Sequence, residues 1–340
     1  MKTALCALLL FTASSIRAKE PERPGRDPRD LEDPTIALRG PVLGLAYDAS
    51  VKGVRPVLGL PGAASLGAPF AVPFALDRAF LGNRGGFALA TDQAAAVVVQ
   101  VTAAGIRKLV GVTAAPDKVV FSPSASTAAL YYADRGVLEV VQHLPAAPKL
   151  TASLDLAALP GPVSALAVSD SGLVLAACQT GTDSGAVFVF AKGRAMFSVL
   201  SVRRASAIAF RGTSDDALVA DAEANLVSRI HDAAGRAAVT VLAGAAEGVS
   251  APVALAASAD GRRAVIANGD GAPVLLVNAE TGAARAVSCG CRVAAAEPMA
   301  GNAVFRLTGP DESPMWLLDA DPPNPRVLFV PLHKALGGAK

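Results

Sequence analysis

The stretch SADGRRAVIANGDGAPVLLVNAETG, residues 258–282, contains the pattern on which the fold prediction rests. Two apolar runs in it are separated and flanked by clusters of Gly, Asp, Asn, Ser and Thr. Apolar runs of about four to seven residues between turn signals indicate strands rather than helices. The same alternation continues along the chain from about Val42, and 31 Gly and 24 Pro leave little room for long helices. The sequence therefore predicts an all-β fold.

A unit of apolar strand, polar turn and second apolar strand recurs along the chain. Its copies are AFLGNRGGFALA (79–90), VFSPSASTAALYY (120–132), AVSDSGLVLAAC (167–178), AFRGTSDDALVA (209–220), AASADGRRAVIA (256–267) and the weaker EPMAGNAVFRL (297–307). Third strands follow at 96–101, 137–142, 186–191 and 273–278, each before a more polar fourth. The equivalent positions Phe80, Phe121, Val168, Phe210, Ala257 and Pro298 are 41, 47, 42, 47 and 41 residues apart. This period matches one four-stranded propeller blade.

The number of blades follows from the requirement that a propeller closes on itself. The six copies of the strand–turn–strand unit predict six whole blades. The last of these spans 292–331, with apolar runs at 292–296, 303–307, 315–318 and 326–330. Residues 40–62 have the pattern of the third and fourth strands of a further, incomplete blade. We therefore predict a single closed β-propeller over 35–340 with seven blades, six being the alternative. The strands near 42–47 and 54–60 should then lie beside the final blade.

The stretch 258–282 also resembles the repeat of bacterial YVTN-type β-propellers, relatives of the WD40-like class. The resemblance rests on Ser258-Ala-Asp-Gly261, Ala264–Asn268, Gly271 and Thr281-Gly282, and weaker versions cover most of 40–330. The Tyr-Val-Thr-Asn tetrapeptide is absent, and a single Trp allows no series of WD dipeptides. The resemblance implies the propeller fold, which hosts enzymes, ligand binders and scaffolds alike.

The N-terminal segment predicts export. Residues 1–18 have a basic start at Lys2, an apolar run at 4–11 and a small-residue region before a cleavage site after Ala18, as in a secretory signal peptide. Residues 19–34 carry ten charges and four prolines and are expected to be a disordered linker. The uncharged stretch 56–76 holds four prolines and three glycines, which argue against a membrane helix. We expect no transmembrane helix in the mature chain and a location in the periplasm, at the cell surface or outside the cell.

Composition excludes several partners. Cleavage removes two of 31 basic residues and none of 29 acidic ones, so the formal net charge falls from +2 to zero. A neutral chain has no electrostatic footprint for nucleic acid or an anionic membrane. Only 16 of the 340 residues are aromatic, which argues against aromatic sugar-binding or base-stacking surfaces. We expect a monomer whose partner is an unidentified protein or extracellular ligand.

No motif predicts catalysis, a metal or a cofactor. The three histidines, His143, His231 and His333, are scattered and form no zinc-ligand pattern. Ser65 lies in a loose relative of the G-x-S-x-G elbow, without a helix after it. Residues 182–185 and 268–271 resemble fragments of calcium loops, but both positions favour hairpin turns. No catalytic, cofactor-binding or metal residue is therefore assigned, and no cofactor is expected.

Three cysteines remain after cleavage, and export favours their oxidation. Cys289 and Cys291 are separated by one glycine, which makes a local disulfide the preferred interpretation. Two free thiols, or a redox or metal role, are the alternatives, and an odd count leaves at least one free thiol. The redox state of Cys178 stays open. The single Trp316, in an apolar strand, predicts packing within or between blades.

Two functions from different classes are consistent with these features. The first is an exported, non-catalytic β-propeller that acts as a binding or interaction scaffold. The second is a metal-dependent propeller hydrolase of the lactonase kind, whose acidic and amide ligands would be scattered over several blades. A cluster of Asp, Glu and Asn side chains at the mouth of the central channel would favour the second.

Overall fold

The computed structural model describes residues 40–331 except 93–96, 270, 310–313 and 322. The chain divides into two compact units, 1–38 and 39–340, and all described residues belong to the second. The predicted signal peptide and linker, 1–34, therefore lie outside the described residues, as do Thr35–Leu38 and His333. Within the described part, helix is limited to two 3-10 turns, η2 (Asn83–Gly85) and η3 (Ala245–Glu247).

The strands form seven separate antiparallel sheets, numbered here as blades in chain order. Blade 1 consists of β1 (Val42–Asp48), β2 (Gly53–Leu60) and β3 (Ala63–Leu66). Blade 2 consists of β4 (Leu76–Gly82), β5 (Phe87–Asp92), β6 (Val97–Thr102) and β7 (Gly105–Lys108). Blade 3 consists of β8 (Lys118–Phe121), β9 (Thr127–Tyr132), β10 (Val137–Gln142) and β11 (Lys149–Asp155). Blade 4 consists of β12 (Val163–Val168), β13 (Val174–Gly181), β14 (Ser184–Phe190) and β15 (Phe197–Val202).

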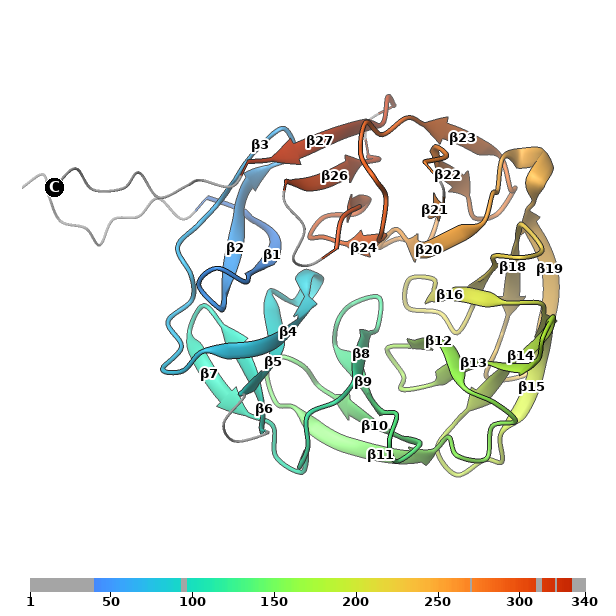
Figure 1. Cartoon of the computed structure of the whole chain (residues 1–340), viewed down its shortest axis with the longest axis horizontal. Helices are drawn as coiled ribbons and strands as arrows, with labels where there is room; N and C mark the ends of the chain where they lie inside the picture. Colours follow the sequence, from blue (N-terminus) through green and yellow to red (C-terminus); the bar gives the residue numbers. More distant parts are fainter. Residues whose placement is uncertain (1–39, 93–96, 270, 310–313, 322, 332–340) are drawn as a thin grey trace, which may run out of the picture. The chain divides into compact units, whose positions relative to one another are not determined.

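The last three blades repeat the four-stranded plan. Blade 5 consists of β16 (Ala205–Phe210), β17 (Ala217–Asp221), β18 (Leu226–His231) and β19 (Ala238–Ala243). Blade 6 consists of β20 (Pro252–Ala257), β21 (Arg263–Asn268), β22 (Val274–Asn278) and β23 (Ala284–Val287). Blade 7 consists of β24 (Glu297–Pro298), β25 (Val304–Arg306), β26 (Met315–Asp319) and β27 (Arg326–Val330). The blades stand around a common centre, as a β-propeller (Figure 1). The predictions of an all-β propeller and of seven blades are confirmed.

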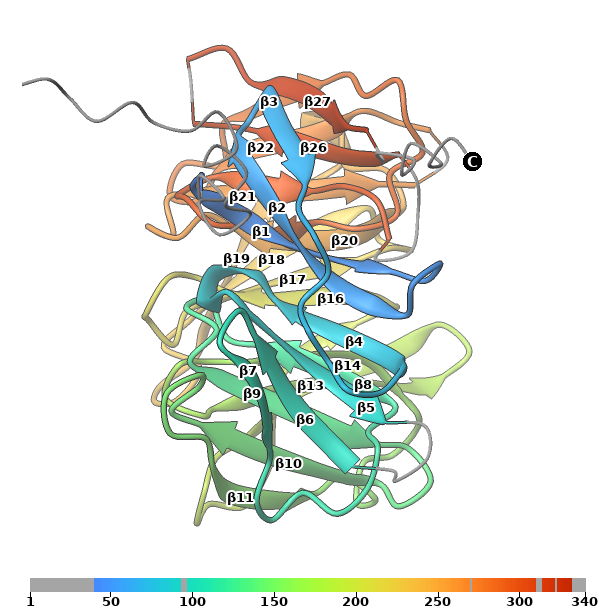
Figure 2. The ribbon, with the colours of Figure 1, turned by 90° about the vertical axis from the view of Figure 1, so that its left-hand side faces the viewer.

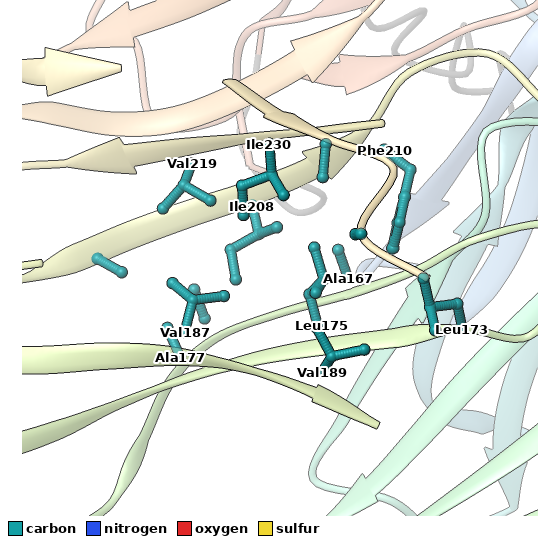
Figure 3. Close-up of a cluster of buried hydrophobic side chains, with 14 residues drawn as sticks. Ala167, Leu173, Leu175, Ala177, Val187, Val189, Ile208, Phe210, Val219 and Ile230 are labelled. Carbon is teal, nitrogen blue, oxygen red and sulfur yellow. The ribbon is translucent and has the colours of Figure 1, made fainter. Parts of the chain in front are cut away.

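The core is divided among the contacts between neighbouring blades. Seven clusters of buried apolar side chains are present, one at each junction between successive blades, including the junction of blade 7 with blade 1. Between blades 4 and 5, Leu175 and Val187 face Ile208 and Val219 (Figure 3). Burying such side chains stabilises each by about 1.5–3 kcal/mol relative to exposure. A blade thus depends on both neighbours, and a closed ring leaves no apolar face uncovered.

The ring closes through the strands of blade 1. Leu43 and Val57 pack with Met299 and Leu317 of blade 7, and the N–H of Ala300 donates to the carbonyl of Leu43 at 2.8 Å. The outer strand β3 lies beside β27 (Figure 2). The prediction that the N-terminal strands lie beside the final blade is confirmed.

The position of those strands within their blade was predicted wrongly. The end of β1 reaches the start of β4, where the Tyr47 hydroxyl donates to the Leu76 carbonyl at 3.0 Å. The middle of β1 reaches the residue that follows β4, where the Leu45 N–H donates to Asn83 Oδ1 at 2.8 Å. Strand β1 therefore runs opposite to the inner strand β4, as second strands do. Residues 42–48 and 53–60 thus take the second and third places and β3 the fourth, and the described residues supply no innermost strand.

The recurring strand–turn–strand unit of the sequence corresponds to the inner two strands of each complete blade. At the end of five inner strands, the next residue donates back across the turn, as Ser258 does to Arg263 at 2.9 Å. Five of the six aligned positions end their strands, but Phe80 lies two residues before the end of β4 at Gly82. In blade 7 the first strand is β24 at 297–298, whereas 292–296 was expected. Residues 294 and 295 instead donate to the Leu307 carbonyl from outside the strand.

Candidate binding cavity

A cavity of about 380 Å³ occupies the centre of the ring. Its wall comes from the inner strands of blades 2 to 7, from the turns after β4 and β8, and from Arg306 on β25. Most of the lining is apolar and includes Val120, Phe121, Val168, Ile208, Phe210 and Leu255. The volume falls within the roughly 300–1,000 Å³ of small-molecule sites, which are also mostly apolar with few polar groups.

One mouth of the cavity is surrounded by the turns that follow the inner strands. The turns of blades 2 to 7 are hydrogen-bonded to their neighbours, and strand β1 links the turns of blades 7 and 2, so that polar contacts connect all seven blades. These contacts are Arg84 Nη1 to Pro123 O (2.9 Å), Ser124 Oγ to Asp170 Oδ1 (2.6 Å), Ser171 Oγ to Asp215 Oδ1 (3.2 Å), Arg211 Nη2 to Gly261 O (2.9 Å), Asp260 N to Asn302 Oδ1 (3.0 Å), Ala300 N to Leu43 O (2.8 Å) and Leu45 N to Asn83 Oδ1 (2.8 Å). This circle of contacts makes the wall at this mouth a continuous structure.

Arg84 extends from η2 into the same mouth. Its guanidinium donates to the carbonyls of Pro123 at 2.9 Å and Ala257 at 3.0 Å, which belong to blades 3 and 6. Its Nε is buried and has no hydrogen-bond partner among the described residues. Burial lowers the pKa of Arg84 to about 10, against the attraction of Asp170 and Asp260. A cation therefore spans the mouth with neutral carbonyls as its hydrogen-bond partners.

Arg306 is a second cation of the cavity wall. It lies on β25, and only 1% of its side chain is exposed. Nη2 is bound to Glu297, while Nε and Nη1 are buried without a hydrogen-bond partner in the described structure. Buried donors left without partners cost about 1–3 kcal/mol each, and more when charged. Two nitrogen atoms of the Arg306 guanidinium, Nε and Nη1, therefore donate no hydrogen bond to the described residues.

Lys118, at the start of β8, completes the charged lining. Although Lys118 is an exposed residue, the protein around its ammonium desolvates the charge and lowers its pKa. The described lining carries three cations against the single carboxylate of Glu297, so the lining itself has a positive surplus, although Asp170 and Asp260 lie close enough to attract Arg84.

The acidic and amide side chains at the mouth form hydrogen bonds within and between the turns. Burial alone would raise the pKa of Asp260, but hydrogen bonds from Ser258, Arg262 N–H and Asn302 outweigh it and hold the pKa below its usual value. Asp170 accepts from Ser124. The described residues contain no group of three or more His, Cys, Asp or Glu side chains placed to hold a metal ion. One acidic and amide group does meet in the turns of blades 6 and 7, where the Asn302 amide donates to Asp260 Oδ2 and to Asp321 Oδ1 at 3.2 Å each.

The structure separates the residues singled out by sequence motifs. His231 lies on β18, with Nδ1 3.3 Å from Asp216 Oδ2, and His143 begins the loop after β10. Ser65 belongs to β3, so no strand-to-helix elbow forms around it. None of these side chains lines the cavity.

Both candidate calcium fragments lie between a second and a third strand. Gly181 pairs with Ser184, so residues 182 and 183 form a two-residue hairpin turn. Asn268 is buried, and its amide donates to the carbonyls of Gly248 and Pro273 at 3.0 and 2.9 Å. Asn268 thus fixes the connection between strands; Asp270 lies outside the described residues.

The cysteines and Trp316 lie away from the cavity. The structure joins Cys289 to Cys291, with Cα atoms 5.0 Å apart, in the connection from blade 6 to blade 7. Cys178 is buried in blade 4, and burial raises the pKa of its thiol. Trp316 packs at the junction of blades 6 and 7, and its ring lies 5.8 Å from that of Phe329.

Sequence reasoning missed the three cations of the cavity. Arg306 carried one usable signal, because it is a charged residue inside the apolar run 303–307. Arg84 lies in a polar turn, and Lys118 is the first residue of a strand; a charge at either kind of position is ordinarily solvated. Only the closed ring brings the three residues to one cavity.

Comparison with solved structures supports the fold. The chain is similar to a functionally unknown protein from Desulfotomaculum acetoxidans DSM 771, with TM-score 0.54, 12% identity, and coverage of 86% of this chain and 100% of that one. It is also similar to Hsv2 of Kluyveromyces lactis, with TM-score 0.52, 7% identity, and coverage of 85% and 97%. Such low identities show a shared propeller fold alone. No family model matches the sequence, and no curated protein matches it.

No helix within the described ranges is long and apolar enough to cross a membrane.

Proposed function

We propose that this chain is an exported, non-catalytic β-propeller that binds a ligand or partner without transforming it. The observation that carries the proposal is the central cavity. It has an apolar wall, and its described lining contains no His, Cys or Asp. Its one carboxylate, Glu297, is engaged by Arg306. General acid–base or nucleophilic catalysis most often uses His, Asp, Glu or Cys side chains, whereas binding requires only shape and a few polar contacts.

Export is the second part of the proposal and rests on residues 1–18. Their basic start, short apolar run and small-residue end have the order of a secretory signal peptide. A YVTN-type repeat, proposed on residues 258–282, would be consistent with a bacterial exported propeller.

Two measurements test the proposal. Expression of the full chain, followed by N-terminal sequencing of the exported product, should give a start at Lys19; a start at Met1 would contradict export. A panel of small molecules is then screened for compounds that raise the melting temperature, because a ligand that binds only the native state stabilises it. Each such compound should be recovered chemically unchanged. Turnover of lactones that stops on addition of a chelator would contradict the non-catalytic assignment.

A further inference from the structure

The central cavity contains more hydrogen-bond donors than its own residues satisfy. Arg306 leaves Nε and Nη1 buried and unpaired, and Arg84 leaves Nε buried and unpaired. Most buried polar groups in proteins have a partner, and each exception calls for an explanation. Both arginines line the same cavity, so a group bound there would lie beside both side chains.

The chemical group that suits these donors best is an acceptor with negative charge. Arginine donates in a planar fork that matches carboxylate oxygens, and charge-assisted bonds of this kind are stronger than neutral ones. Lys118 adds a third positive charge to the wall, while Glu297 is bound to Arg306. The positive surplus disfavours a cationic ligand and favours an anion.

The rest of the cavity wall indicates the chemical character of the remainder of the ligand. Apolar residues form most of the lining, and they include Val, Leu, Ile and Phe side chains from blades 3 to 6. An inorganic anion would leave this apolar surface uncovered. A molecule with a carboxylate at one end and a hydrocarbon body would satisfy both parts of the cavity.

We infer that the central cavity binds a small organic carboxylate, with the anionic group held by Arg84 and Arg306 and the apolar body against the strand walls. The inference rests on the proposed binding function and specifies its ligand class. The carboxylate can belong to a free acid or to the C-terminus of a short peptide.

The test measures binding to the purified chain by titration calorimetry. The probes are octanoate, octylammonium, octanol and acetate, which separate the charge from the hydrocarbon body. A leucine-rich pentapeptide with a free or an amidated C-terminus distinguishes the two sources of the carboxylate. Octanoate or the free-terminus peptide should bind, and octylammonium, octanol, acetate and the amidated peptide should bind at least tenfold more weakly.

Variants assign the site. Arg84→Gln and Arg306→Gln should each weaken carboxylate binding by about 10- to 100-fold, as expected for loss of a charged hydrogen bond. Arg229→Gln is the matched control, because Arg229 also has a buried, unpaired Nε but does not line the cavity. Its carboxylate affinity should equal that of the parent chain. If Arg306→Gln does not fold, Arg84→Gln decides the result.

The outcomes separate this inference from the function on which it rests. Three results would overturn the inference: equal affinity for octanoate and octanol, unchanged affinity in Arg84→Gln, or no binding by any probe. The proposed binding function would then still be tested by the melting-temperature screen. Chelator-sensitive hydrolysis of a lactone would instead overturn the proposed function.

Discussion

Blade 1 and blade 4 solve the same packing problem with different numbers of strands. Blade 4 has four strands, and its inner strand β12 contributes to the cavity wall. Blade 1 has three strands among the described residues, and none of these residues lines the cavity. Both are nevertheless buried between two neighbours. Among the described residues, the second to fourth strands of blade 1 cover both neighbouring blades, while the inner strands of the other blades line the cavity.

The largest expected effect comes from removing blade 1. Deletion of residues 35–62 takes away β1 and β2 and exposes the apolar faces of blades 2 and 7. We expect insoluble or molten protein, measured by solubility and near-UV circular dichroism. Removal of residues 19–34 is the control and should leave the melting temperature unchanged. A soluble 35–62 deletion with an unchanged cooperative melt would show that the six later blades close by themselves.

Single core truncations compare the two blades more finely. Leu175 in blade 4 and Leu45 in blade 1 are both fully buried. Leu175→Ala should cost about 2–5 kcal/mol, because the cavity it leaves lies between complete blades. Leu45→Ala should fall at the lower end of that range, since neighbours beside a three-stranded blade can relax more. Denaturant unfolding measures both, and an equal or greater cost at Leu45 would contradict this difference.

The hydrogen bond from Leu45 N–H to Asn83 Oδ1 fixes blade 1 to blade 2. Asn83→Ala removes the acceptor and leaves a buried N–H unsatisfied, at a cost of about 1–3 kcal/mol. Asn83→Asp keeps an oxygen at this position and should cost less. Equal destabilisation of the two variants by denaturant unfolding would show that the lost packing, rather than the hydrogen bond, matters.

The pair Cys289 and Cys291 belongs to the connection that leads to the short strand β24. With the disulfide formed, the exported chain should show one alkylatable thiol in denaturant, Cys178, and three after reduction, counted by mass spectrometry. The closed loop is very short, so reduction should lower stability by only about 1 kcal/mol. Three thiols before reduction would support the alternative of free cysteines.

The smallest effect concerns pH and blade 1. The hydrogen bond from Ser50, opposed by burial and aided by Arg55, lowers the pKa of Asp48. A carboxyl with a lowered pKa stabilises the fold above its unfolded value of about 3.9, and this contribution is lost as pH falls through the folded value. Asp48→Asn should therefore reduce stability at pH 7 and make it less dependent on pH below about 4. Identical pH profiles of melting temperature would contradict the contribution.

The sequence by itself determined the strands, the blade period and the seven-blade ring. Turn residues such as Asp260 and Gly261 act over a few positions, so their signal survives in the linear sequence. The order of strands in blade 1 was decided by tertiary structure. The direction of β1 becomes evident only from contacts with residues about 30 to 40 positions away, such as those with Leu76 and Asn83.

The cavity was likewise decided by tertiary structure alone. Arg84, Lys118 and Arg306 come from three blades, and no local pattern relates an arginine in a polar turn to one in an apolar strand. Closing the ring places all three side chains at one cavity, and desolvation there lowers the pKa of Arg84 to about 10 and also lowers that of Lys118. Local turn chemistry thus sets the repeat, while long-range closure sets the electrostatics of the site.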